Sequence, residues 1–212
     1  KRHIDRAYSC PTFLGYEPVR PKAVQKYLTA EELHRIMTTP LHRQTLYHVR
    51  DMFLFSCYTG IPYGDMRLLT KENLSLAEDG TWWIKSARQK TKVEFEIPLL
   101  DLPLQILNKY RDTAPDGKLL PMYCNSMLNL YLKEIARICN IDRPLVFHAG
   151  RHTYATEITL SHGVPLETVS KMLGHSQIET TQIYAKVTDD KIDADTRVLN
   201  RKISARFSVV IS

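Results

Sequence analysis

The sequence predicts a mixed, mainly α-helical fold with a small antiparallel β-hairpin or sheet. Three observations lead to this prediction. Apolar residues recur at helical spacing in most segments, and several of these segments carry capping residues at their ends. Paired runs of β-branched and aromatic residues stand out in only one stretch, residues 80–99. We find no internal repeat and no low-complexity tract, so helices with one small antiparallel sheet account for the whole pattern.

The first helices are predicted from caps and breakers. Residues 1–25 are rich in Pro and basic residues and are expected to be a linker or the tail of a preceding domain. A helix follows over residues 28–39, where Thr29 can cap and Glu32 can close a capping box. A more buried helix over residues 45–60 should stop at Gly60, and a short helix should follow Pro62.

For the rest of the chain, the sequence predicts one hairpin followed by further helices. Two strands around the polar centre "ARQKTK" predict a hairpin that closes near Pro98. Amphipathic helices are then expected over residues 101–112, 125–140, 148–163 and 165–175, with a short one over 178–187. Gly163 should end the third of these. Residues 189–212 are a charged tail with an apolar end.

Composition narrows the class of protein. The chain has 212 residues, 43% of them hydrophobic, which suits one large domain with an extensive core and excludes a disordered chain. A formal net charge of +6 favours an anionic partner, above all nucleic acid, although a merely basic soluble domain has the same signature. No apolar run is long enough to span a membrane, and no small-molecule site is indicated.

The cysteines indicate a redox compartment, and the first residues indicate whether the sequence is part of a longer protein. Cys10, Cys57, Cys124 and Cys139 are far apart, and three of them lie among apolar residues. This predicts buried free thiols in a reducing, cytoplasmic compartment rather than a disulfide framework. The first residue is not a methionine and no signal peptide is recognisable, so we expect a fragment of a longer protein.

The segment "HAGRHTYATEITLSHG" raises the question of chemistry. On a helix, His148, Arg151 and His152 share one face, because they lie at positions i, i+3 and i+4. A zinc site would need a glutamate between the histidines or a third ligand, and neither is evident. By itself the segment is more typical of a surface arginine and a structural histidine than of a metal site.

Downstream residues change this interpretation. "LGHS" places His175 after a helix, and Tyr184 follows in "TTQIYAKV". His148-x-x-Arg151, His175 and Tyr184 together resemble the catalytic signature of the tyrosine recombinases, or phage integrase family, in order and spacing. The resemblance covers about three-quarters of the chain, from "LTAEEL" to "YAKV", and predicts a recombinase catalytic domain at residues 26–188.

The resemblance implies a role for each residue. Tyr184 would attack a DNA phosphate and hold the 3′ end as a phosphotyrosine, while Arg151, His148 and His175 would bind or protonate the phosphate oxygens. In the hairpin, Lys90 matches the family's lysine, the general acid for the leaving 5′-oxygen. Bond energy stays in the protein–DNA linkage, so no metal, ATP or other cofactor is implied. His152 is expected to be structural or to support the site from behind.

One position departs from the family pattern. The family's first catalytic arginine follows "T-G-L", but here the segment reads "TGIPYGDM", with Pro62 at that position. Loss of a guanidinium from the phosphate removes about 3–4 kcal/mol of transition-state stabilisation unless it is replaced. We expect Arg88 to replace it, because residues i and i+2 of a strand face the same way and Arg88 would then lie beside Lys90. Arg50 is the second candidate and Arg67 the third; some integrases of mobile elements also lack this arginine.

The resemblance also implies partners, and it leaves alternatives open. Double-stranded DNA is the expected partner, bound by a homo-oligomer that is a tetramer on DNA and can be a monomer in solution. An N-terminal DNA-clamping domain would precede residue 26, and the tail at 189–212, with Phe207, Val209, Val210 and Ile211, could dock on a neighbouring protomer. The alternatives are a DNA-binding module without catalysis, a type IB topoisomerase, and a metal-dependent hydrolase built on His148 and His152.

Overall fold

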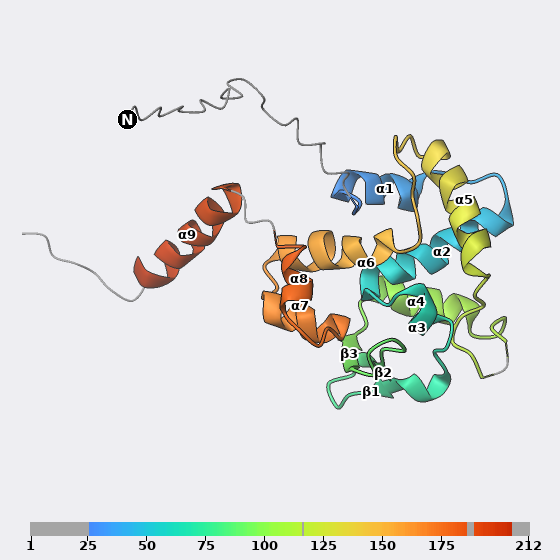
Figure 1. Ribbon diagram of the computed structural model, residues 1–212, viewed down its shortest axis with the longest axis horizontal. Coiled ribbons are helices and arrows are strands. Elements are labelled where there is room, and N and C mark those ends of the chain that lie inside the picture. Colours follow the sequence, from blue (N-terminus) through green and yellow to red (C-terminus); the bar gives the residue numbers. More distant parts are fainter. Residues whose placement is uncertain (1–25, 116, 186–188, 205–212) are drawn as a thin grey trace, which may run out of the picture.

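The computed structural model describes residues 26–115, 117–185 and 189–204. Figure 1 shows a body of helices with a small sheet at its lower end and one helix, α9, standing apart. The predicted mainly helical class is confirmed. The α-helices are α1 (Ala30–Thr38), α2 (Gln44–Thr59), α3 (Tyr63–Met66), α4 (Asp101–Tyr110), α5 (Asn125–Ile138), α6 (Ala149–Thr153), α7 (Leu166–Leu173), α8 (Glu179–Gln182) and α9 (Asp189–Ser204). The strands are β1 (Leu74–Leu76), β2 (Trp82–Ala87) and β3 (Glu94–Pro98), and the other helical turns are η1 (Lys71–Asn73), η2 (Tyr154–Thr159) and η3 (Leu160–His162).

Local signals account for the first two helices. Thr29 accepts a hydrogen bond from the Glu32 amide, and the Glu32 carboxylate accepts one from the Thr29 amide, which is the predicted capping box. Helix α2 ends as predicted at Gly60, whose left-handed φ of 69° suits glycine. Pro62 is the N-cap of α3. The predicted linker at residues 1–25 lies outside the described residues.

The core forms around α2. This helix is buried on most of its surface and packs against α4, α5 and α6 (Figure 1). Its mixed apolar sequence has no polar face, which is the pattern of a helix surrounded by others. A second, smaller cluster lies beside α6 and α7 and contains Tyr154, Val169, Leu173 and Tyr184. Tyr184 is therefore anchored in an apolar cluster and not at a free surface.

The sheet has three antiparallel strands in the order β1-β2-β3. The hairpin of β2 and β3 pairs Ile84 with Ile97, and both side chains are buried. Strand β1 was not predicted from the sequence; it pairs Leu74 with Ile84 at the other edge of β2. The strand has only three residues, too few for an alternating pattern to stand out.

The stretch beginning at Ala149 is helical to His162 but not α-helical throughout. Its middle part, η2, is a π-helix in which the Thr159 hydroxyl donates to the carbonyls of Tyr154 and Ala155. Gly163 ends the stretch with a φ of 81°, as predicted. The following α7 begins after Pro165 and ends at Gly174, which is also left-handed.

Three observations complete the fold. Cys57 and Cys139 are buried free thiols, as predicted for most of the cysteines, whereas Cys124 is an exposed free thiol at the start of α5. The charged tail, for which no helix was predicted, contains α9. Within the described ranges, no helix combines the length and apolar character needed to cross a membrane.

Candidate active site

The side chain of Tyr184 lies just beyond the short helix α8. Its exposure is 9%, and its amide donates to the carbonyl of Thr181 at 3.0 Å. Burial raises the pKa of the Tyr184 phenol, while the charge of Arg151, a hydrogen bond from it, and the charge of Arg88 oppose that rise. The neighbours that favour the phenolate are thus both arginines.

Arg151 lies on α6 with an exposure of 3%. Its Nη1 donates to the Gly60 carbonyl at 2.8 Å, and its Nη2 donates to the Leu173 carbonyl at 2.7 Å. Nη2 is also 2.9 Å from Nε2 of His175. Burial first, and then the charge of Arg88, lower its pKa to about 10. The two main-chain carbonyls therefore orient the guanidinium. A guanidinium has five N–H donors, and those that the two carbonyls and His175 do not use remain for a further ligand.

His175 follows α7 and closes its C-terminal end. Gly174 takes the left-handed conformation, and the His175 amide donates back to the Ser170 carbonyl at 3.1 Å. The His175 ring is nearly parallel to the Tyr184 ring, at 8° and 6.5 Å between centroids. Burial and the charges of Arg151 and Arg88 lower the pKa of His175 to about 4. The ring is therefore neutral at pH 7.

A chain of aromatic rings joins His148 to Tyr184. The His148 and His152 centroids are 4.8 Å apart, and those of His152 and Tyr184 are 5.2 Å apart, both edge to face. Burial and the charges of His148, Lys26 and Arg151 lower the pKa of His152 to about 4. His148 is the N-cap of α6, and its pKa is also lowered, by burial and by nearby cations.

Arg88 lies beside Arg151. Its Nη1 donates to the Leu173 carbonyl at 3.3 Å, the same oxygen that Arg151 binds, and its Nε is 2.6 Å from the Asp65 carboxylate. The two residues are both largely buried. The predicted reason for this placement is wrong, because β2 ends at Ala87 and Arg88 begins the hairpin turn. What brings Arg88 here is its ion pair with Asp65, together with the hydrogen bond that the Gln89 amide donates to Asp65 Oδ1 at 2.9 Å.

The structure does not bring every candidate to this cluster. Lys90 is exposed in the turn between β2 and β3. Arg50 is directed elsewhere: its Nη1 donates to the carbonyls of Ile36, Met37 and Thr39 at 3.2–3.5 Å, and its guanidinium lies over Tyr47. Arg50 therefore closes the end of α1 and does not replace the arginine missing at position 62. Arg67 is exposed.

Several groups that take part in this cluster were not predicted from the sequence. Asp65 occupies the acidic position of the "T-G-L-R-x-x-E/D-L" pattern, so its spacing could have identified it as the partner of an arginine. The carbonyls of Gly60 and Leu173 could not have been identified, because main-chain groups carry no sequence signal. Lys26, whose charge acts on His148 and His152, enters from the segment before α1.

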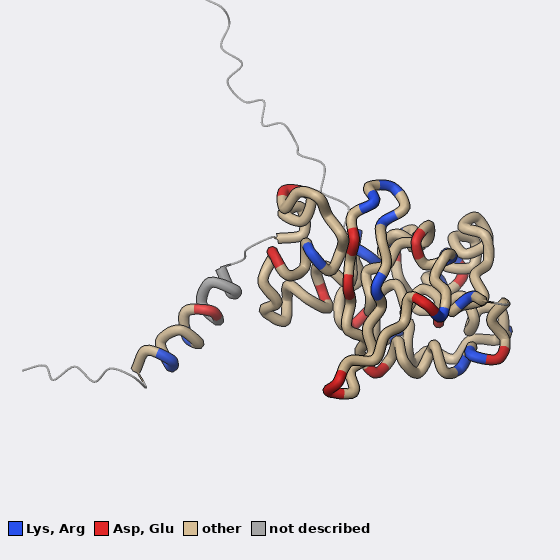
Figure 2. The backbone as a smooth tube through the Cα atoms, turned by 90° about the horizontal axis from the view of Figure 1, so that it is seen from below, with Lys and Arg blue, Asp and Glu red and all other residues tan. Residues whose placement is uncertain are grey.

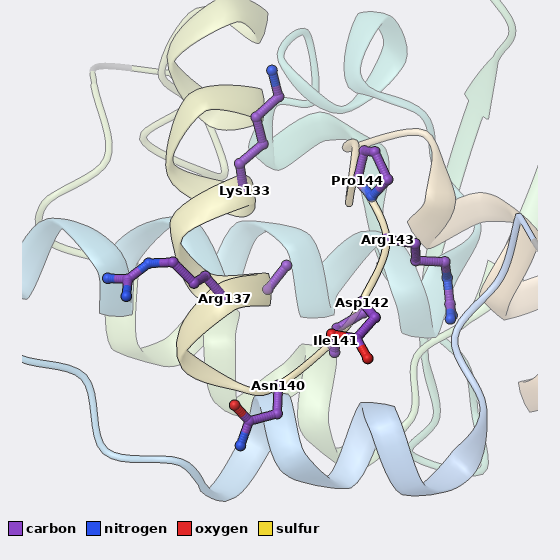
Figure 3. A pocket seen from close by; sticks show the side chains of 8 residues that line it. Lys133, Arg137, Asn140, Ile141, Asp142, Arg143 and Pro144 are labelled. Carbon is purple, nitrogen blue, oxygen red and sulfur yellow. The ribbon is translucent and has the colours of Figure 1, made fainter.

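One cavity lies beside this cluster and a second lies far from it. A cavity of about 270 Å³ is lined by Pro62, Tyr63, Asn129 and His148, so it opens at the position of the missing arginine. A larger one of about 470 Å³ lies at the end of α5 (Figure 3). Lys133, Arg137 and Arg143 line this cavity, and Arg143 is bound to Glu32. Among the described residues, no third His, Cys, Asp or Glu joins His148 and His152 in a group that could hold a metal ion.

Comparison with known proteins agrees with this geometry. The model of the phage integrase family matches residues 26–191. Tyrosine recombinase XerD of Halalkalibacterium halodurans is 28% identical over 199 residues, which are 87% of this chain and 64% of that protein. XerD of Staphylococcus aureus is 29% identical over 196 residues, 86% of this chain and 65% of that protein. The chain thus spans just under two-thirds of the length of these relatives.

Solved structures share the fold. The XerH site-specific recombinase bound to a difH substrate superposes with a TM-score of 0.66 at 16% identity, covering 84% of this chain and 56% of that one. The Tn1549 transposon integrase in complex with circular intermediate DNA superposes with a TM-score of 0.61 at 18% identity, covering 84% and 68%. With the family model matching most of the sequence, the chain belongs to the phage integrase family and has the catalytic-domain fold of tyrosine recombinases.

Proposed function

We propose that this chain is the catalytic domain of a site-specific DNA recombinase or integrase that cleaves and rejoins DNA through a 3′-phosphotyrosine intermediate. The observation that carries the proposal is the convergence of Arg151, Arg88 and His175 on Tyr184. These residues come from four separate segments of the chain. A buried phenol beside Arg151 and within the electrostatic influence of Arg88 is suited to attack an anion whose charge the same cations neutralise.

The reaction follows from the groups present. The Tyr184 oxygen attacks the phosphorus, the bond to the 5′-oxygen breaks, and the phenol proton leaves to a base at the site, where the imidazole of His152 lies edge to face with the Tyr184 ring. Arg151 and Arg88 stabilise the negative charge on the non-bridging oxygens. Lys90, on the basic hairpin turn, supplies the proton to the leaving 5′-oxygen once DNA lies against the turn. A 5′-hydroxyl from another strand reverses the step, so neither a metal nor ATP is needed.

Binding and assembly form part of the same proposal. XerH and the Tn1549 integrase are described as complexes with DNA, and the net charge of +6 suits the same partner here. We propose that the protein acts in the cytoplasm as a homo-oligomer, a tetramer on DNA, with an N-terminal DNA-clamping domain before residue 26. Residues 189–212 would dock on a neighbouring protomer.

A nicked suicide substrate tests the proposal. The full-length protein is incubated with nicked DNA that carries its attachment site, and covalent adducts are separated on a denaturing gel. We expect an adduct with the wild type and none with Tyr184→Phe, at equal DNA affinity. DNA binding with a steep salt dependence but no adduct would instead support a binding module without catalysis, a reading that Pro62 favours. Relaxation of supercoiled DNA without joining of two sites would support a type IB topoisomerase.

A further inference from the structure

Thr181 occupies a position between the histidine and the tyrosine of the site. Its side chain is fully buried, with 0% exposure, and it lies on α8 three residues before Tyr184. Its Oγ1 is 2.7 Å from Nδ1 of His175, and its carbonyl accepts the Tyr184 amide at 3.0 Å. One residue thus contacts His175 through its side chain and Tyr184 through its main chain.

The contacts of His175 determine which of its nitrogens carries the proton. Arg151 has only N–H donors, so a hydrogen bond between its Nη2 and His175 Nε2, at 2.9 Å, requires an unprotonated Nε2. The proton of the neutral ring must then be on Nδ1. Nδ1–H donates to the Thr181 hydroxyl, which is the acceptor at 2.7 Å. Loss of that acceptor would leave a buried N–H without a partner and favour the other tautomer.

We infer that Thr181 is a positioning residue: it holds His175 in the Nδ1–H tautomer, so that Nε2 accepts from Arg151 and the imidazole stays parallel to the Tyr184 ring. The inference rests on the proposed function for its catalytic consequence. In the Nε2–H tautomer, two donors would face each other across the Arg151–His175 contact. The Arg151 fork would then be displaced from the site where phosphate is expected to bind.

Three variants of the full-length protein test the inference. Thr181→Val keeps the shape of the side chain without the hydroxyl, Thr181→Ser keeps the hydroxyl, and Thr180→Val changes an exposed neighbour on the same helix. The nitrogen chemical shifts of His175 report its tautomer at pH 7. The rate of adduct formation on nicked DNA reports the chemistry, and gel shifts report DNA affinity.

We expect Nδ1–H in the wild type, Thr180→Val and Thr181→Ser, and a shift toward Nε2–H in Thr181→Val. Adduct formation by Thr181→Val should fall about ten- to a hundredfold at unchanged DNA affinity, because the displaced Arg151 fork stabilises the transition state less well. Serine should restore it to within about threefold. A merely structural threonine would change the melting temperature and leave the tautomer unchanged.

Other outcomes overturn the inference. An Nε2–H tautomer in the wild type does so even if Thr181→Val fails to fold. The inference also fails if Thr181→Val keeps both the wild-type tautomer and the wild-type rate. It fails as well if Thr181→Ser forms the adduct as slowly as Thr181→Val. If the wild type forms no adduct at all, the proposed function fails, but the nitrogen shifts still decide whether Thr181 sets the tautomer.

Discussion

At the scale of single residues, Arg88 and Arg151 are two like charges held around one carbonyl oxygen, that of Leu173. Their repulsion contributes to the lowered pKa of Arg151, after burial. Asp65 offsets part of that repulsion through its ion pair with Arg88. The pair therefore forms a cationic site that is already assembled in the free protein, so an anion that binds there does not have to order the guanidiniums first.

Substitution of Arg88 tests its role as the replacement for the missing arginine. We expect Arg88→Ala to lower the rate of adduct formation about 10²–10³-fold, because a charged donor to the phosphate is lost. Arg67→Ala, at an exposed position close by in the sequence, should stay within about twofold. Because Arg88→Ala also leaves Asp65 unpaired, the variant Arg88→Ala with Asp65→Asn controls for stability. Equal rates for the Arg88 and Arg67 variants would contradict the role.

Two of the histidines with a lowered pKa, His152 and His175, predict how stability depends on pH. His152 and His175 have pKa values of about 4 in the folded state, against about 6.5 when unfolded. Between these values the unfolded chain binds more protons, so the free energy of unfolding falls as pH is lowered from about 6.5 to about 4. Urea unfolding at pH 7 and pH 4.5 measures the loss. The lowered pKa of carboxylates such as Glu32 also makes the free energy of unfolding fall as the pH is lowered. The contribution of the histidines is therefore tested by comparison: His152→Gln and His175→Gln should lose less unfolding free energy between pH 7 and pH 4.5 than the wild type does.

At the scale of elements, the C-terminal end of α7 organises the site. Its last carbonyl lies between the two guanidiniums, where a helix C-terminus favours cations. Gly174 allows this in two ways: it turns the chain with a φ of 64°, and it leaves room for Arg88. A Cβ at this position would be 2.8 Å from the Arg88 Cγ.

Two glycine variants separate these contributions. Gly163 has a φ of 81° and open space around the position of a Cβ, so Gly163→Ala should cost only backbone strain, about 1–2 kcal/mol of unfolding free energy. Gly174→Ala should cost at least as much and should also slow adduct formation about tenfold or more, because Arg88 must move. Urea unfolding and the nicked-substrate assay measure the two effects. Equal activity in the two variants would show that the approach of Arg88 to Gly174 does not matter for the reaction.

At the scale of the whole molecule, α9 stands apart from the body (Figures 1 and 2). It carries basic residues in its last turn and exposes Val198, Leu199 and Ile203. The apolar tail residues, Phe207, Val209, Val210 and Ile211, lie outside the described residues. An exposed apolar stripe on a helix is typical of a surface that another protein covers, and a neighbouring protomer is the partner that the proposed assembly supplies.

Charge variants of α9 test this docking. We expect Leu199→Asp and Ile203→Asp to require about tenfold more protein to form oligomers on DNA, corresponding to about 1.4 kcal/mol. Asn200→Asp adds the same charge beside the apolar stripe and should have little effect. Truncation after Thr188 should abolish the oligomers without lowering the melting temperature of the body. Native gels and sedimentation measure assembly, and unchanged oligomers after truncation would refute the docking of the tail.

Local patterns in the sequence predicted most of the elements. The Thr29–Glu32 capping box, the stop at Gly60 and the hairpin before Pro98 depend on residues within a few positions of one another. Strand β1 and helix α9 were missed, because three residues show no period and a highly charged segment shows little apolar repeat. The set His148, Arg151, His175 and Tyr184 came from spacing and resemblance, and the structure brings its members together.

By itself, the sequence thus determined the fold class, the family resemblance, and the absence of an arginine at position 62. Only the tertiary structure showed where the two candidate arginines lie, Arg88 on the Leu173 carbonyl and Arg50 on the end of α1. Only the tertiary structure also placed His152 against Tyr184, and Thr181 against His175. The physical reason is that helix periods and caps act within a turn or two, whereas the direction of a buried polar side chain is set by whichever donor or acceptor the packing leaves beside it.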